Sequence, residues 1–394
     1  MVAAYAGPME DPTQAPPPVP IVLPETVVTP GPSPADESRR ITRGLLVWLV
    51  LIAAGGLLSA LLQHAEGALF FAMAGVLVLA QASDAAAVLQ GYRDWVQFHV
   101  PKSEARGALF RGLVRAIVPL FTALFFCGIG AWALQTEPLL PRHRLAAGWS
   151  FGAAVLCAML MWRPAADLAT RACFRSGPIG RTRRLTARVV VMALLLPVPL
   201  RLLAPEMIDA LQASGEPLAD AGGLASQLVG EVAIAFAGVG LFVRRDWRAS
   251  LERLGIVAMR PAHLALAVLG LGAIIGLNAG MEWMQRTYFH ALWLQDSEIT
   301  RLIAADLPLA TSILLGVSAG VGEEISLRGA LQPRLGIVLT SIVFASLHVQ
   351  YTWIGMLTIA LLGALLGLLR ARTNTTTAIV VHAAYDIFAV LTSR

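Results

Sequence analysis

The chain has 394 residues, of which 57% are hydrophobic and 14% are charged, and its mean hydropathy is +0.68. Soluble domains carry about 25% charged residues, so this composition excludes an ordinary soluble domain and indicates a membrane protein. The net charge of +5 comes from arginines in short clusters between apolar runs, a pattern typical of cytoplasmic loops that does not indicate a nucleic-acid partner. The three cysteines are well separated and predict neither a disulfide framework nor a zinc ribbon.

The first segment of the chain is rich in proline. Residues 1–38 hold ten of the 23 prolines, in stretches such as APPPVP and TPGPSP. Such a segment buries too little apolar surface to offset the entropy cost of folding. We therefore expect residues 1–40 to form a disordered, proline-rich tail.

Long apolar runs fill the rest of the chain. A helix needs about 20 apolar residues to cross the hydrocarbon core of a bilayer, within a range of about 17–25. The sequence accordingly predicts an all-α, polytopic transmembrane bundle of about 11 spans, near residues 44–63, 68–90, 113–134, 145–162, 187–204, 224–243, 263–284, 309–326, 335–350, 353–370 and 376–391.

The loops between these runs alternate in charge. Loops 92–112, 163–186 and 244–262 are rich in arginine, whereas loop 205–223 carries acidic residues and no basic one. Basic loops mark the cytoplasmic side, so we expect a cytoplasmic N-terminus and an integral protein of a bacterial inner (plasma) membrane. The break at 244–262 predicts a six-span region at 41–245, of unknown role, and a C-terminal domain at 246–394.

Ionisable side chains inside a span are costly and indicate functional sites. Glu231 lies deep in its predicted span, where a satisfied buried polar group or a misplaced span boundary is favoured over a functional site. The last 90 residues instead carry three clusters in three different spans. These clusters are Glu323, Glu324 and Arg328; then His348; then His382 and Asp386. A common water-filled cavity would satisfy all of them together, so we expect them to converge.

Helical spacing predicts the neighbours inside each cluster, because residues i and i+4 share a helix face. Glu324 and Arg328 should form an ion pair, and Glu323, rotated by about 100°, should stay free. By the same spacing Asp386 should fix the tautomer of His382, and His348 should pack against Phe344.

One free carboxylate and two histidines in a wet pocket are the groups that activation of water requires. Glu323 would act as the general base. The histidines would either bind the developing oxyanion or ligate a metal ion whose bound water is the nucleophile. Glu324 and Arg328 would support the site by keeping the motif helix rigid and Glu324 ionised.

Three motifs carry a resemblance to a known family: EEISLR at 323–328, FASLH at 344–348 and HAAYD at 382–386. In this order they resemble the EExxxR, FxxxH and HxxxN/D motifs of the CPBP intramembrane proteases, also called the ABI or type II CAAX-prenyl endopeptidase family. Gly329 and Gln332 match further residues common in that family. The resemblance covers about residues 250–394. Leu327, where the family often has phenylalanine, is a packing change, and Asp386 replaces the commoner asparagine.

The resemblance implies a glutamate-dependent endopeptidase in which Glu323 activates water with His348. It implies that His382 and Asp386 help to bind the oxyanion, and that Glu324 and Arg328 support them. It leaves open whether a divalent metal such as Zn²⁺ takes part, with Glu323, His348 and His382 as ligands, because the chain has no HExxH motif. The expected partners are the lipid bilayer and a membrane protein or peptide substrate. The oligomeric state stays open.

Three alternatives come from the same residues. GVSAG at 316–320 matches the G-x-S-x-G pattern of a serine nucleophile, and Ser318 with His382 would make an intramembrane serine protease. We instead expect these small residues to let helices approach closely. The motifs could also persist in a non-catalytic scaffold or immunity-type module. Third, buried carboxylates would suit a proton-coupled transporter, which the lack of a visible inverted repeat disfavours.

Overall fold

The computed structural model describes residues 34–61, 65–96, 104–174, 176–214, 219–304 and 307–393. These residues are nearly all helical and form no strand, which confirms the predicted all-α class. The first half holds α1 (Pro34–Leu61), α2 (Ala65–Val96), α3 (Glu104–Gln135), α4 (Pro141–Met159), α5 (Arg163–Cys173), α6 (Arg181–Leu195), α7 (Pro197–Leu202), α8 (Ala204–Ser214) and α9 (Ala221–Val239).

The second half carries the three motifs. Its helices are α10 (Trp247–Leu254), α11 (Pro261–Tyr288), α12 (His290–Ala304), α13 (Leu309–Glu323), the π-helix η1 (Glu324–Leu331), α14 (Gln332–Leu335), α15 (Ile337–Ser346), α16 (Trp353–Arg372) and α17 (Thr375–Thr392). The predicted tail at 1–40 lies outside the described residues up to residue 33, and residues 34–40 belong to α1.

Within the described residues, eight helices are long and apolar enough to cross a membrane, or up to ten if each of two bent helix pairs counts as one span. The bent pairs are α4 with α5, at 102°, and α12 with the helix from Leu309 to Leu335, at 115°. The predicted count of 11 is therefore not confirmed. The main difference is α15, which has 10 residues where the sequence predicted a span at 335–350. At about 1.5 Å per residue it is too short to cross a bilayer core alone.

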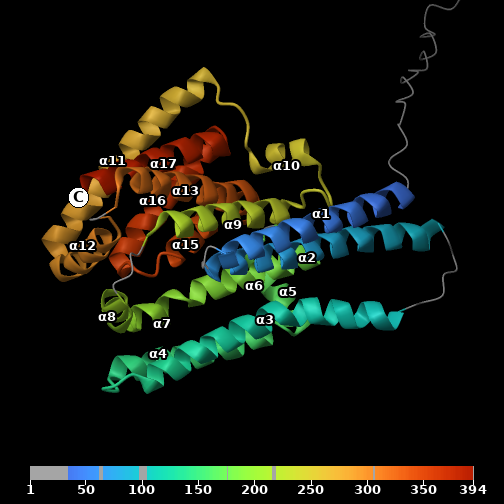
Figure 1. The fold of residues 1–394 in the computed structure, drawn as a ribbon, viewed down its shortest axis with the longest axis horizontal. Helices are drawn as coiled ribbons and strands as arrows, with labels where there is room; N and C mark the ends of the chain where they lie inside the picture. Colours follow the sequence, from blue (N-terminus) through green and yellow to red (C-terminus); the bar gives the residue numbers. More distant parts are fainter. Residues whose placement is uncertain are drawn as a thin grey trace, which may run out of the picture.

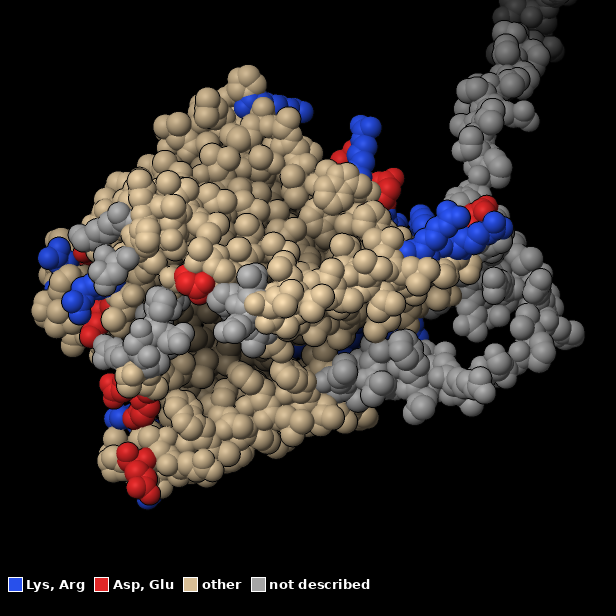
Figure 2. Space-filling view, in the orientation of Figure 1, with Lys and Arg blue, Asp and Glu red and all other residues tan. Residues whose placement is uncertain are grey.

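The long helices run roughly side by side, and the C-terminus lies at the opposite end of the molecule from the start of α1 (Figure 1). Most of the visible face is uncharged, and basic side chains gather where α1 begins (Figure 2). An uncharged middle with basic residues at one end is what a lipid-facing surface requires.

Helix α9 joins the two halves. It packs against α2 on one side and against α13 and η1 on the other. Its N-terminus is capped by Asp220, whose side chain accepts from the backbone N–H of Gly222 and Gly223, and it ends at Gly240, where φ is +83°. Left-handed backbone of this kind favours glycine. The last helix of the predicted N-terminal region is thus part of the bundle that holds the motifs.

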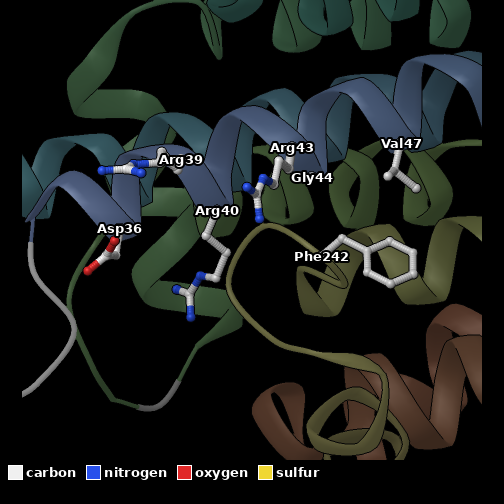
Figure 3. Close-up of a pocket in the computed structure, with 7 residues that line it drawn as sticks. All are labelled: Asp36, Arg39, Arg40, Arg43, Gly44, Val47 and Phe242. Carbon is white, nitrogen blue, oxygen red and sulfur yellow. The ribbon is translucent and has the colours of Figure 1, made fainter.

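The turn after α9 docks onto the start of α1. Trp48 donates a hydrogen bond from Nε1 to the carbonyl of Leu241 at 2.9 Å. Gly44 allows this close approach, because a Cβ atom there would lie 2.4 Å from the carbonyl oxygen of Phe242. A cavity of about 340 Å³ at this junction is lined by Arg39, Arg40 and Arg43 with Asp36, Gly44, Val47 and Phe242 (Figure 3). It contains none of the motif residues.

Candidate active site

The first motif sits where α13 changes into a π-helix. Glu323 is the last residue of α13, and Glu324 is the first residue of η1. π-Helical turns are rare and are often found at functional sites. The apolar pattern predicted one regular helix here, and no sequence signal indicated the π-helical turn.

Small residues bring α13 into close contact with α17. A Cβ atom at Gly316 would lie 2.6 Å from Cγ1 of Ile387, and one at Gly320 would lie 2.6 Å from the backbone nitrogen of Ala383. Only glycine fits at such a separation. The structure confirms the predicted close-packing surface in GVSAG, and this contact places the glutamates of α13 and η1 beside His382 of α17.

Glu324 connects the first motif to the third. Its Oε2 lies 3.5 Å from Nε of Arg328, and its Oε1 lies 3.0 Å from Nδ1 of His382. Both members of the Glu324–Arg328 pair are fully buried. The predicted ion pair is present. The cross-helix contact to His382 was missed, because spacing along one helix says nothing about a neighbouring helix.

Arg328 is held in place by further contacts. It donates from Nη2 to the carbonyl of Gly363 at 3.2 Å, and its guanidinium lies 4.8 Å from the ring centre of Phe344. A buried charge is tolerated only when it is paired and hydrogen-bonded. Arg328 is paired with Glu324 and is held by Nη2 on α16 and by the ring of Phe344 on α15, but its Nε and Nη1 atoms and Oε2 of Glu324 are buried without a hydrogen-bond partner.

Glu323 lies on the other side of His382. Its Oε2 is 3.9 Å from Nε2 of the imidazole, and the same nitrogen lies 3.4 Å from Oδ2 of Asp386. The side chains of Glu323 and Asp386 are 17% and 18% exposed, compared with 0% for Glu324. The Oε2 atoms of Glu323 and Glu324 are both buried without a hydrogen-bond partner, and that of Glu324 lies in the ion pair with Arg328.

His348 follows the end of α15. Its Nδ1 lies 2.9 Å from the carbonyl oxygen of Phe344, so this nitrogen carries the proton and Nε2 is the acceptor of the neutral ring. The ring of Phe344 packs edge-on against His348, at 4.8 Å between ring centres, and against His382, at 5.9 Å. The second and third motifs therefore share one aromatic side chain, and the predicted packing of His348 on Phe344 is present.

The predicted metal ligands are not arranged as a metal centre. Across the described part of the chain, no group of three or more His, Cys, Asp or Glu side chains is positioned to hold a metal ion. Glu323 and His382 are neighbours, whereas His348 contacts Phe344. The observed arrangement thus does not fit a three-ligand site built from Glu323, His348 and His382.

Ser318 does not take part in this arrangement. It is 1% exposed and donates its hydroxyl to the carbonyl of Leu315 in its own helix, at 3.0 Å. A serine nucleophile needs a base within hydrogen-bond reach. The hydroxyl of Ser318 is bonded to a backbone carbonyl instead, so this geometry does not support the Ser318–His382 alternative.

Residues after the first motif anchor it to other elements. A Cβ atom at Gly329 would lie 2.9 Å from the carbonyl oxygen of Leu254, and Gln332 donates to the carbonyl of Gly367 at 2.9 Å. Arg253 of α10 donates to the carbonyl of Gly329 at 3.0 Å. Burial and neighbouring arginines lower the pKa of Arg253 to about 10, so it stays charged at neutral pH. These contacts fix the end of η1.

Glu231 of α9 also reaches this site. Its Oε1 accepts a hydrogen bond from Gln227 at 3.0 Å, and its Oε2 is buried without a partner. The sequence favoured a satisfied polar group over a functional site, and the hydrogen bond from Gln227 satisfies Oε1 but not Oε2. The sequence signal for this residue was its depth in a predicted span. Only the packing of α9 on α13 shows that its carboxyl group reaches the site.

The fold and this cluster define a membrane-embedded helical protein with a buried carboxylate–imidazole site. Residues 305–388 match the family described as type II CAAX prenyl endopeptidase Rce1-like, so this part of the chain is similar to that family of CAAX-type intramembrane proteases. The uncharacterized protein YpbD of Bacillus subtilis is 28% identical over 145 residues, which cover 36% of this chain and 74% of that protein. No solved structure matches the chain. The resemblance predicted from the three motifs is confirmed.

Proposed function

We propose that the chain is an intramembrane endopeptidase that cleaves membrane-associated or prenylated-type peptide substrates with water activated by Glu323. The observation that carries this proposal is the difference between two adjacent carboxylates. Glu324 is fully buried and lies in an ion pair with Arg328 and against His382, whereas the side chain of Glu323 is 17% exposed and lies 3.9 Å from Nε2 of His382. Only the second carboxylate is free to take a proton from water.

The hydrolysis would proceed as follows. Glu323 removes a proton from water as the water oxygen attacks the carbonyl carbon of the scissile bond. The carbonyl oxygen becomes an oxyanion, which an N–H donor on His382 stabilises. When the carbon–nitrogen bond breaks, Glu323 returns the proton to the leaving amine. The products are one new carboxyl group and one new amine.

The other motif residues orient these two groups. Glu324 accepts from Nδ1 of His382 and so fixes the ring, while Asp386 adds negative charge beside Nε2. A carboxylate partner of this kind stabilises the protonated imidazole. His348 donates from Nδ1 to the carbonyl of Phe344, which fixes the orientation of its ring, and it assists Glu323 in activating the water.

The orientation in the membrane follows from the positive-inside rule. The start of α1 and the turn after α9 meet at one end and carry arginines, among them Arg43 and Arg244. The C-terminus lies at the other end (Figure 1). These positions support a cytoplasmic N-terminus in a bacterial plasma membrane.

Comparative peptidomics of membranes that carry the wild type or Glu323→Gln tests the function. We expect a set of product peptides that depends on the wild-type protein and disappears in the variant. Glu252→Gln is the matched control, because that glutamate is 60% exposed on α10. Identical products from the wild type and from Glu323→Gln would contradict the protease and favour a non-catalytic scaffold.

A further inference from the structure

Glu231 brings a third glutamate to the site from a helix outside the family match. It lies in α9, and the match begins at residue 305. Gln227, one turn earlier, donates to Oε1, which leaves Oε2 buried and without a hydrogen-bond partner. A buried carboxylate oxygen that lacks a partner is costly, and an ordered water is a common explanation for one.

The unpartnered oxygen of Glu231 faces α13 at Gly322, the residue before Glu323. A Cβ atom at Gly322 would lie 2.1 Å from Oε2 of Glu231, so glycine at this position makes the space that the carboxyl group occupies. Glu323 is the next residue, and it also has a buried, unpartnered Oε2. The unpartnered oxygen of Glu231, on α9, therefore lies against α13 one residue before the unpartnered carboxylate of Glu323.

The residues of α2 and η1 that pack against α9 next to Glu231 are uncharged. A Cβ atom at Gly230 would lie 2.5 Å from Cβ of Phe70 on α2, and Ser326 of η1 donates to the backbone carbonyl of Glu231 at 3.0 Å. The charged groups that act on Glu231 are Glu323 of α13 and His382 of α17. Both belong to the site already described.

We propose that Glu231 is a positioning residue that, together with Glu323, holds the attacking water. The water would donate one hydrogen to Oε2 of each glutamate, which satisfies both orphan oxygens and directs its lone pair away from them. Glu323 then takes one proton during attack, while the other hydrogen bond, to Glu231, persists. This inference rests on the proposed function, because it concerns the same water.

The test compares Glu231→Leu and Glu231→Gln with a matched control in the same helix. Ser226→Ala is that control, since Ser226 is a buried polar residue of α9 whose hydroxyl faces the position of Gly67. The substrate is a synthetic peptide that spans a cleavage site found by the peptidomics, and the full-length protein is assayed in liposomes. Thermal unfolding in detergent verifies that each variant is folded.

We expect Glu231→Leu to lower kcat by about 10- to 100-fold with KM changed less than about threefold, since misplacing a reactant by about 1 Å costs roughly 100-fold. Glu231→Gln, which keeps an acceptor oxygen, should lose less than Glu231→Leu. Ser226→Ala should match the wild type. A rise in KM with kcat unchanged would overturn the proposal, because it would indicate substrate binding.

Gly322→Ala offers a second approach that leaves the glutamate in place. The added methyl group would displace the carboxyl of Glu231 and so lower kcat, and in the Glu231→Leu background the same change should cost much less. Equal losses in both backgrounds would overturn the proposal, as would wild-type rates for Glu231→Leu. If Glu323→Gln keeps its activity, the proposed function itself fails; if only Glu323→Gln is inactive, this inference alone fails.

Discussion

Oε1 of Glu324 lies 3.0 Å from Nδ1 of His382, although the two residues are 58 positions apart in the chain. The same carboxylate lies 3.5 Å from Nε of Arg328 through its other oxygen. Glu324 therefore orients the imidazole and is itself oriented by a guanidinium. A glutamate with this role is as necessary for the geometry as the glutamate that meets the water.

Glu324→Gln tests this relationship. The amide keeps the shape but removes the charge that orients and stabilises the imidazole, so we expect kcat of peptide cleavage to fall by about 100-fold or more. Thermal unfolding should show a folded protein. Activity within about twofold of the wild type would show that His382 is oriented without Glu324.

Arg328→Met tests the buried ion pair. Removal of one partner leaves Glu324 as an uncompensated buried charge, which typically costs about 3–5 kcal/mol. We expect a marked drop in the midpoint of thermal unfolding in detergent. Arg248→Met is the control: Arg248 is 90% exposed and pairs with Glu252, so its midpoint should stay close to that of the wild type. Equal midpoints for the two variants would contradict this role.

Gly320→Ala tests the contact between α13 and α17. Its Cβ atom would lie 2.6 Å from the backbone of Ala383, next to His382, and overpacking of this kind costs about 1–3 kcal/mol. We expect lower stability and lower kcat together. Gly276→Ala in α11 meets nothing within 4 Å and should be neutral or stabilising by up to about 1 kcal/mol. Equal stability and equal kcat for Gly320→Ala and Gly276→Ala would contradict the close contact between α13 and α17.

Ser318→Ala distinguishes the serine alternative from the glutamate mechanism. The hydroxyl donates only to the carbonyl of Leu315 in its own helix, so its loss should leave the Glu323-dependent product peptides unchanged. Comparative peptidomics of membranes provides the readout. Loss of these products in Ser318→Ala, with their retention in Glu323→Gln, would reverse the assignment of the nucleophile.

Glu206 predicts a pH dependence of stability away from the site. Burial alone would raise the pKa of this α8 carboxyl, but hydrogen bonds from Arg142 and from His143, the latter at 2.8 Å, outweigh it and lower the pKa below the ordinary 4.5. Its contribution to stability is therefore present above pH 4.5 and is lost as the pH falls through the folded-state pKa. Glu206→Gln should lower the midpoint at pH 7 by about 2–4 °C, and the difference should shrink below about pH 4.

Spacing along single helices predicted part of the site correctly. Glu324 with Arg328, and His348 with Phe344, are i and i+4 neighbours, and the structure brings both pairs together. The glycines of GVSAG were likewise predicted to pack against another helix. These features are local or need only one face of one helix, and the chain order of the residues contains that information.

Other features of the site and the fold were predicted wrongly, because they do not follow from spacing along a single helix. The sequence interpretation gave Asp386 the task of fixing the tautomer of His382, whereas Glu324 makes the shorter contact, at Nδ1. The 10-residue α15 was predicted as a full span because the apolar run continues past its last residue. The length of an apolar run does not show where the backbone leaves the helix.

The sequence by itself determined that this is a helical membrane protein, because apolar runs of about 20 residues have few stable alternatives in a bilayer. It also determined the three motifs, since the chemistry of a carboxylate or an imidazole belongs to the residue. Only the tertiary structure decided which side chains meet. The glycines that let α13 approach α17, and the packing of α9 on α13, bring Glu324 to His382 and Glu231 to Gly322. Contacts between helices depend on the crossing of two surfaces, and no spacing along one chain segment specifies that crossing.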